Sequence, residues 1–186
     1  GLESIRYPPL DEEMVKNLNS IVDLLLSAGA NPNAADKYGE TALIQAAHNG
    51  YTEIVDALIK AGAKSNFLLS LEYAAEGGHT DIVKLLLKAG ADEVVDDIYV
   101  EDTPLIVAAM NGHADTVKAL IEGGADPNAR GSRDWPPLMW AVTHCNPKTV
   151  QALIAGGADK NPEIKDGYGN IVDISDQICS EYKEYD

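Results

Sequence analysis

A short word recurs along the chain at a nearly constant interval. The pair Gly-Ala begins at Gly29, Gly62, Gly90, Gly124 and Gly157, in steps of 33, 28, 34 and 33 residues. A fixed period of about 20 to 50 residues indicates an array of structural repeats rather than one globular fold. Each repeat in such an array is a small supersecondary unit that buries its apolar face only by stacking on its neighbours.

A second marker has the same spacing. A pair of small apolar residues begins at Ala46, Ala74, Ala108 and Ala141, in steps of 28, 34 and 33 residues. Leu43 precedes Ala46 by three residues, so the two side chains share one face of a helix. The small side chains let a second helix approach closely. This part of each repeat therefore predicts a short helix that packs along the stack.

The next part of each repeat predicts a second helix. Ile54, Val55, Leu58 and Ile59 have helical spacing, and the glycines at Gly50 and Gly62 end the first and second helix. Each unit is thus two short antiparallel helices followed by a linking loop.

The sequence motifs of these units resemble those of the ankyrin repeat family. They include "TPL" at 103–105, "GH" at 78–79 and 112–113, and "GADPN" at 124–128. The histidine that usually follows Thr-Pro-Leu in the family is absent, and its place is taken by Ile44, Glu72, Ile106 and Met139. The resemblance covers nearly the whole chain. It implies an all-α solenoid of stacked helix-turn-helix units with short β-hairpin fingers.

We divide the chain, as one ankyrin-repeat domain, into six units. They are a cap-like first repeat at 1–35, central repeats at 36–68, 69–96, 97–130 and 131–163, and a C-terminal cap at 164–186. "PPL" at 8–10 stands in the Thr-Pro-Leu place of the first unit, with its second helix in "IVDLLL". Ile171, Ile174 and Ile178 give the last unit one amphipathic helix.

One repeat is shorter than the others. Seven residues separate Asn33 from Thr41, whereas only Phe67 and Leu68 separate Asn66 from the equivalent Leu69. Two residues are too few for a hairpin, so one finger is missing near 67–68. This is either a neutral deletion in a variable loop or a notch that admits a bulky element of a partner.

The sequence contains no motif of a catalytic or cofactor site. It has no nucleophile elbow, no phosphate-binding glycine loop and no His-Glu-x-x-His zinc motif. His79 and His113 occupy the repeat word "GH", for which we expect a structural hydrogen bond. We therefore expect no enzyme activity, no cofactor and no metal.

Charge and cysteine content restrict the partners and the compartment. The net charge of −16 argues against nucleic acid as a ligand, which needs a basic face. No apolar run is long enough for a membrane span. Cys145 and Cys179 are too few for a disulfide framework, and we expect them to be reduced. We expect a monomer inside the cell, in the cytoplasm, with the nucleus or delivery into a host cell as alternatives.

The first helix of each repeat also has an outward stripe. If the small pair faces the core, the opposite stripe contains Gln45, His48, Asn49, Tyr73, Glu76, Val107, Met110, Asn111, Trp140, Thr143 and His144. In ankyrin-like proteins this stripe lines the concave groove. Together with the fingers it gives the partner-binding residues that we predict: Tyr38, Tyr73, Tyr99, Asp102, Met110, Arg133, Trp135 and Trp140. Exposed aromatic residues and arginine dominate interface energies. The alternative for Trp135 and Trp140 is that they pack on the loop of their own repeat.

The predicted function is a non-catalytic protein–protein interaction module that binds its partner on the groove and the fingers. The run "DEVVDDIYVED" at 92–102 has six acids and no base, so it is either a solvated loop or a dock for a basic partner segment. The alternative function is an adaptor or targeting segment of a larger enzyme or of a host-directed effector. A designed scaffold and a direct enzyme are the remaining classes, and irregular repeats argue against the former.

Overall fold

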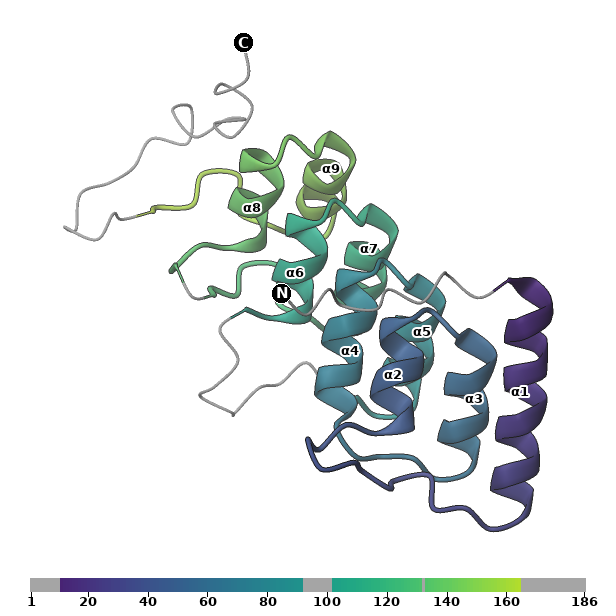
Figure 1. The fold of residues 1–186 in the computed structure, drawn as a ribbon. Helices are drawn as coiled ribbons and strands as arrows, with labels where there is room; N and C mark the ends of the chain where they lie inside the picture. Colours follow the sequence, from purple (N-terminus) through teal and green to yellow (C-terminus); the bar gives the residue numbers. More distant parts are fainter. Residues whose placement is uncertain (1–10, 92–101, 132, 165–186) are drawn as a thin grey trace, which may run out of the picture.

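The computed structural model describes residues 11–91, 102–131 and 133–164. These residues form nine α-helices, which follow one another along the chain in Figure 1. They are α1 (Glu12–Ser27), α2 (Ala42–His48), α3 (Thr52–Lys60), α4 (Phe67–Glu76), α5 (Thr80–Lys88), α6 (Pro104–Met110), α7 (Ala114–Glu122), α8 (Pro137–Thr143) and α9 (Pro147–Ala155).

The helices stack in two rows. Helices α2, α4, α6 and α8 contact one another in sequence and form what we call the inner row. Helices α1, α3, α5, α7 and α9 contact one another in the same way and form the outer row. Each inner helix also pairs with the outer helix that follows it. The predicted solenoid of helical hairpins is therefore confirmed.

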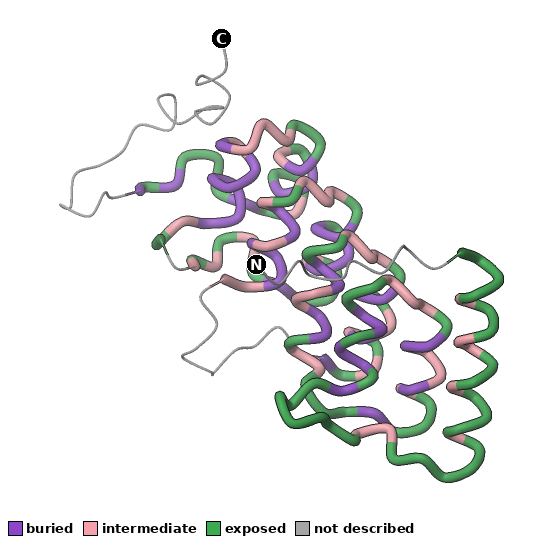
Figure 2. Tube along the Cα trace, in the orientation of Figure 1, coloured by how far each residue is buried: buried purple, intermediate pink, exposed green. Residues whose placement is uncertain are grey.

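The small residues of the repeat occupy matching places in this stack. Ala46 is 3 % exposed, and Ala74, Ala108 and Ala141 are completely buried. They lie in one continuous core together with leucines and valines of both rows. Figure 2 shows the buried segments gathered on the inner helices and on the facing sides of the outer ones. Close approach of the inner helices follows from side chains no larger than a methyl group.

Two inner helices begin at a threonine cap. The Thr41 hydroxyl accepts a hydrogen bond from the Ile44 amide, and the Thr103 hydroxyl accepts one from the Ile106 amide, both at 3.3 Å. Each cap satisfies an amide that has no partner within its helix. Pro104 stands at the first helical position, where a missing N–H costs nothing.

The short repeat lacks its finger, as predicted, and lengthens its inner helix instead. Helix α4 begins seven residues before Ala74, whereas α2 begins four residues before the equivalent Ala46. Three residues that would enter a finger thus add most of a helical turn. Asn66, in the left-handed region with φ 59°, precedes this turn, and its side chain donates to the Gly39 carbonyl of the preceding finger at 3.2 Å.

The finger that the structure describes in full is less regular than predicted. Its two arms are joined by one isolated antiparallel bridge, between Ala35 and Thr41. The tip is held instead by the Asp36 carboxylate, which accepts hydrogen bonds from the Tyr38 and Glu40 amides at 2.8 and 3.0 Å. Within the described residues no finger contains a strand of two or more residues.

The two ends of the stack differ from the central repeats. α1 is one continuous helix of 16 residues, capped by Asp11, rather than a second helix confined to "IVDLLL". Leu18, Val22 and Leu26 pack on the core, whereas Ile21 and Leu24 on the other side of α1 are 52 % and 71 % exposed. The predicted C-terminal cap, from Lys165 onward, and the "PPL" word lie outside the described residues.

The histidines of the "GH" words join successive repeats. The His79 Nε2 atom lies 3.3 Å from the His48 carbonyl, and the His113 Nε2 atom lies 2.8 Å from the Glu76 carbonyl. In the last repeat the Asn146 side chain donates to the Met110 carbonyl at 3.3 Å. We call these three side chains the ladder residues. The predicted structural role of the two histidines is confirmed.

Candidate functional site

The inner row and the loops before it carry the residues predicted to bind a partner. Tyr38 in the finger is 75 % exposed, Arg133 is exposed, Trp140 is 7 % exposed, and Tyr73, Asp102, Met110 and Trp135 are half-buried. Tyr99 lies outside the described residues. The structure brings Arg133, Trp135 and Trp140 together at the C-terminal end of the inner row. Tyr38 and Tyr73 lie nearer its N-terminal end, each against a side chain outside the predicted set.

The cluster at the C-terminal end contains Arg133, Trp135, Trp140 and His144, and we call it the tryptophan cluster. The ring centroids of Trp135 and Trp140 lie 5.2 Å apart, and those of Trp140 and His144 lie 5.9 Å apart. The Arg133 guanidinium lies over both indoles, 5.9 Å from the Trp135 centroid and 5.4 Å from the Trp140 centroid. These distances are typical of cation–π contacts and hold the exposed arginine in place.

Trp140 does not present its face to solvent. It is a buried residue, so the alternative that a tryptophan packs on the loop of its own repeat holds for Trp140, while Trp135 stays half-exposed above it. The physical reason is that the loop before α8 folds back over the helix and lays Trp135 on Trp140. The Trp140 Nε1–H is buried with no hydrogen-bond acceptor. A buried donor without an acceptor costs free energy in the folded state, and because this atom is buried it is not itself a contact for a partner.

Two separate aromatic contacts lie nearer the N-terminal end of the inner row. The rings of His48 on α2 and Tyr73 on α4 stack with their centroids 4.9 Å apart. In the neighbouring finger the Lys37 ammonium lies 4.7 Å from the Tyr38 ring centroid. These aromatic faces are accessible to a partner.

Three carboxylates lie near the middle of the inner row, and we call them the central acids: Glu72 and Glu76 on α4, and Asp102 before α6. Burial raises the pKa of Glu72 above its usual value, and the negative charges of Glu76 and Asp102 raise it further. The structure therefore concentrates negative charge at the middle of the inner row. A cation placed there would lower the electrostatic cost of all three groups.

Sequence reasoning missed some members of the site. His48, Glu76 and His144 belong to the predicted stripe but were not selected as binding residues. Glu72 was noted only as the residue in place of the family histidine. Its spacing of four residues from Glu76 puts both carboxylates on one helical face, and this was the signal that could have found it.

The remaining chemistry of the described residues is sparse. They contain no group of three or more side chains that could hold a metal ion. None of the nine helices in this part of the chain is long and apolar enough to cross a membrane. Cys145 is disulfide-bonded, so the expectation that this thiol is reduced is wrong. The expectation followed from the low cysteine count, which reports on the number of possible bridges and not on their geometry.

Comparisons with known proteins agree with this architecture. A family model described as ankyrin repeats, in three copies, matches residues 13–97 and 71–164. The putative ankyrin repeat protein YahD of Escherichia coli (strain K12) is 44 % identical over 64 residues, a match that spans 32 % of this chain and 32 % of YahD. The chain thus aligns with about a third of the length of that relative.

A solved structure is similar over most of the stack. The ankyrin repeat domain of Bcl-3, described as a unique member of the IkappaB protein family, superposes with a TM-score of 0.69 and 29 % sequence identity. The match covers 84 % of this chain and 72 % of the Bcl-3 chain. Ankyrin repeats are in general modules for protein–protein interaction. With the two rows of helices, the matching alanines and the family model over most of its length, this chain belongs to the ankyrin repeat family.

Proposed function

We propose that this chain is a non-catalytic module that binds one protein partner along the inner row and the loops before it. The observation that carries the proposal is the tryptophan cluster: an exposed arginine that lies over two indoles in contact with each other. Tryptophan and arginine are the residue types most enriched among those that dominate interface energies.

The charges of the face suggest the chemistry of the partner. The central acids Glu72, Glu76 and Asp102 favour a lysine or arginine of the partner near α4 and α6. The exposed Arg133 guanidinium is a donor, so it favours a carbonyl or carboxylate of the partner at the C-terminal end. We therefore propose an extended partner segment with a basic residue toward the middle of the inner row and an acceptor next to Trp135.

The experiment is a selection of displayed peptides on the purified chain, followed by titration calorimetry of the selected peptides with variants. We expect Trp135→Ala and Arg133→Ala each to weaken binding by about 2 kcal/mol, or roughly 30-fold in Kd. We expect Glu72→Gln with Glu76→Gln to weaken selectively those peptides that contain a basic residue.

The matched control is Lys118→Ala on the outer row, because Lys118 is exposed and forms a surface salt bridge with Asp115. We expect this variant to bind as the wild type does. Selected peptides that bind all three inner-row variants with unchanged affinity would contradict the proposed face. A melting temperature measured for each variant separates lost binding from lost folding.

The alternative is an adaptor segment of a larger enzyme or effector. It would bind its partner through the same face and differ only in the attached enzyme or effector domain. The match to YahD extends over a third of that protein, so the activity and partners of the whole relative are not carried over. The monomeric state, the lack of nucleic-acid binding and the cytoplasmic location stay predictions. A disulfide at Cys145 bears on the last of these, because reducing compartments disfavour such bonds.

A further inference from the structure

The loop before α8 makes the same backbone turn as the Tyr38 finger. The Gly131 amide donates to the Trp135 carbonyl at 3.2 Å, and the equivalent Asp36 amide donates to the Glu40 carbonyl at 2.9 Å. The two loops can therefore be compared position by position, and differences between them are differences of side chains on one turn.

The comparison shows that the loop before α8 lacks the group that holds the other turn. In the Tyr38 finger the Asp36 carboxylate binds two amides of the tip. Gly131 stands in its place, and an added Cβ there would clash with the Asp102 carboxylate and lie 2.7 Å from Ile106 Cδ1. The glycine lets this turn rest on the loop before α6, but it leaves the tip without an internal carboxylate.

Arg130 binds this turn from outside. Its Nη1 atom donates to the Asp134 carbonyl at 2.7 Å and to the Asp134 carboxylate at 3.1 Å. Its Nη2 atom donates to the Glu163 carbonyl at 2.8 Å, in the segment after α9. Asp134 has φ 57°, a left-handed conformation that is unfavourable for a residue with a side chain. The planar guanidinium thus joins a strained turn to the next repeat through several fixed donors.

This link is absent from the Tyr38 finger. Arg130 follows Asn128 by two residues, and Ala35 follows the equivalent Asn33 by two residues. Both asparagines donate to a glycine carbonyl of the next repeat, Gly157 and Gly62 respectively. The asparagine bond is therefore common to both repeats, whereas a methyl group at position 35 cannot make the bonds of Arg130.

The turn that Arg130 binds carries the tryptophan cluster. Trp135 directly follows Asp134, and its ring lies on Trp140 of α8. In the Tyr38 finger the equivalent residues, Glu40 and Gln45, are joined by a side-chain hydrogen bond instead. The indole contact has no hydrogen bond of its own to fix it, so the place of Trp135 depends on the turn before it.

We infer that Arg130 is a positioning residue of the tryptophan cluster: it ties the loop before α8 to the segment after α9 and so keeps Trp135 on Trp140 before a partner arrives. The consequence for affinity rests on the proposed function, whereas the positioning is a property of the free protein. A loop that is already ordered loses less conformational entropy on binding.

The first test needs no partner. The chain contains two tryptophans, and both lie in the cluster. Their rings lie 5.2 Å apart at an angle of 56°, an arrangement that couples their transitions in circular dichroism. We expect Arg130→Gln to lose most of this coupled band, while its melting temperature changes by less than about 3 °C because Arg130 is exposed. An unchanged band would overturn the inference, whatever peptide selection finds.

Two variants separate the bonds of Arg130 from its charge. Lys160→Gln removes an exposed positive charge at the same end of the molecule and should keep the band. Asp134→Asn removes the carboxylate but leaves both carbonyl acceptors, and asparagine tolerates the left-handed backbone, so most of the band should stay. Equal losses in Asp134→Asn and Arg130→Gln would contradict the role of the two carbonyl bonds.

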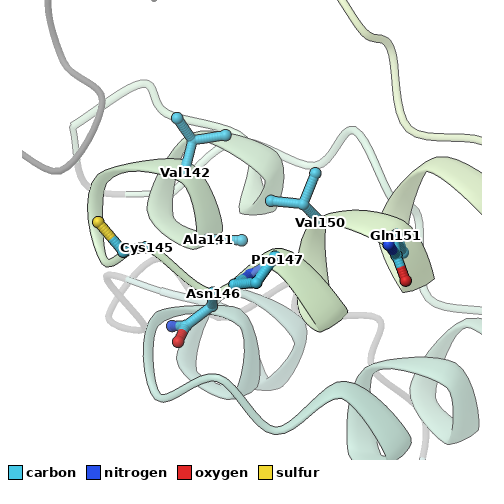
Figure 3. A pocket seen from close by; sticks show the side chains of 7 residues that line it. All are labelled: Ala141, Val142, Cys145, Asn146, Pro147, Val150 and Gln151. Carbon is cyan, nitrogen blue, oxygen red and sulfur yellow. The ribbon is translucent and has the colours of Figure 1, made fainter.

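A third variant separates positioning from general stability. Figure 3 shows Val142 on α8 and Val150 on α9 pointing to the same side of the last hairpin, where they line an apolar hollow. Val142 is two positions from Trp140, about 200° around the helix, so this side is away from the cluster. Val150→Ala should lower the melting temperature and keep the band below the transition. Loss of the band in this variant would show that the band reports stability rather than positioning, and would overturn the inference.

The second test uses a selected peptide and measures rates. We expect Arg130→Gln to raise Kd roughly 5- to 10-fold through slower association, because the loop is competent to bind for only part of the time. Dissociation should be unchanged, whereas Trp135→Ala should dissociate faster. Lys160→Gln measures the share of slower association that is due to charge alone. Faster dissociation from Arg130→Gln would identify a direct contact and overturn positioning. If no peptide binds the wild type, the proposed function fails and the band still decides the inference.

Discussion

A glycine in one repeat makes room for the ladder residue of the next repeat. Gly78 has φ +68°, and an added Cβ would lie 2.5 Å from the His113 ring. The glycine is therefore needed both for its backbone and for the space it leaves. His113 uses that space to reach the Glu76 carbonyl.

The first prediction concerns this position. We expect Gly78→Ala to lower the free energy of unfolding by about 2–4 kcal/mol, because left-handed strain and displacement of His113 add together. Gly39→Ala is the control, since Gly39 has φ +83° and nothing within 4 Å of an added Cβ. Gly39→Ala should lower the free energy of unfolding by about 1–2 kcal/mol, from backbone strain alone. Urea denaturation of both variants checks the difference, and equal losses would contradict the role of the close contact.

The second prediction concerns Glu72, whose pKa is raised first by burial and then by Glu76 and Asp102. A carboxyl with a raised pKa in the folded state binds its proton more tightly there than in the unfolded chain. Its contribution to stability is therefore present below the unfolded pKa, about 4.5, and is lost as pH rises through the folded pKa. Glu72→Gln should stabilise the protein at pH 7 and have almost no effect at pH 3.5.

The expected gain is less than about 1 kcal/mol, because Glu72 is only half-buried and solvent screens its neighbours. Urea denaturation at the two pH values measures it. The control is Asp23→Asn on the exposed side of α1, away from both ends of that helix, which should change stability little at either pH. A loss of stability at pH 7 in Glu72→Gln would contradict the assigned cause of the pKa shift.

At the scale of elements, α4 shows how the stack absorbs a deletion. Five residues fewer than in the preceding repeat remove the finger, and the inner helix begins a turn earlier. Phe67 opens that turn and packs against the core, while Leu69 in the same turn is 36 % exposed. The extra turn thus continues the core where another repeat has a projecting loop.

The third prediction tests this packing. Phe67→Ala should lower the free energy of unfolding by about 2 kcal/mol, less than a fully buried phenylalanine, because the ring is half-buried. Leu69→Ala should change it by less than about 1 kcal/mol. Thermal and urea unfolding give both values. If the two substitutions were equally mild, the turn would not be part of the core.

The same elements show how far the sequence could predict the structure. The repeat spacing and the small residues at Ala46 and Ala74 were enough to locate the helices. Packing between neighbouring helices requires small side chains at fixed positions, and these positions are visible in the sequence. The start of α4 at Phe67 was not predictable, since helix ends depend on tertiary contacts more than on pattern. Burial of Trp140 depends on how the loop carrying Trp135 folds over it, and no local pattern specifies that path.

At the scale of the whole molecule, the stack separates stability from recognition. The small and aliphatic residues that join repeats lie between the rows. The tryptophan cluster, the central acids and the Tyr38 finger lie along the inner row and the loops before it. Because the main helix–helix contacts of the described residues lie within a repeat or between neighbouring repeats, a change in these loops leaves distant repeats intact. Side chains on the inner row and in the loops before it can therefore change to suit a partner without loss of the stack.

The most direct test of this account is hydrogen–deuterium exchange of the full chain with and without a peptide selected for binding. The account predicts slower exchange in the bound state at residues 133–140 and at α4 and α6. It predicts unchanged exchange in the outer helices α5, α7 and α9. Protection confined to the outer row, with the tryptophan cluster unchanged, would contradict the central claim that the inner row and its loops bind the partner.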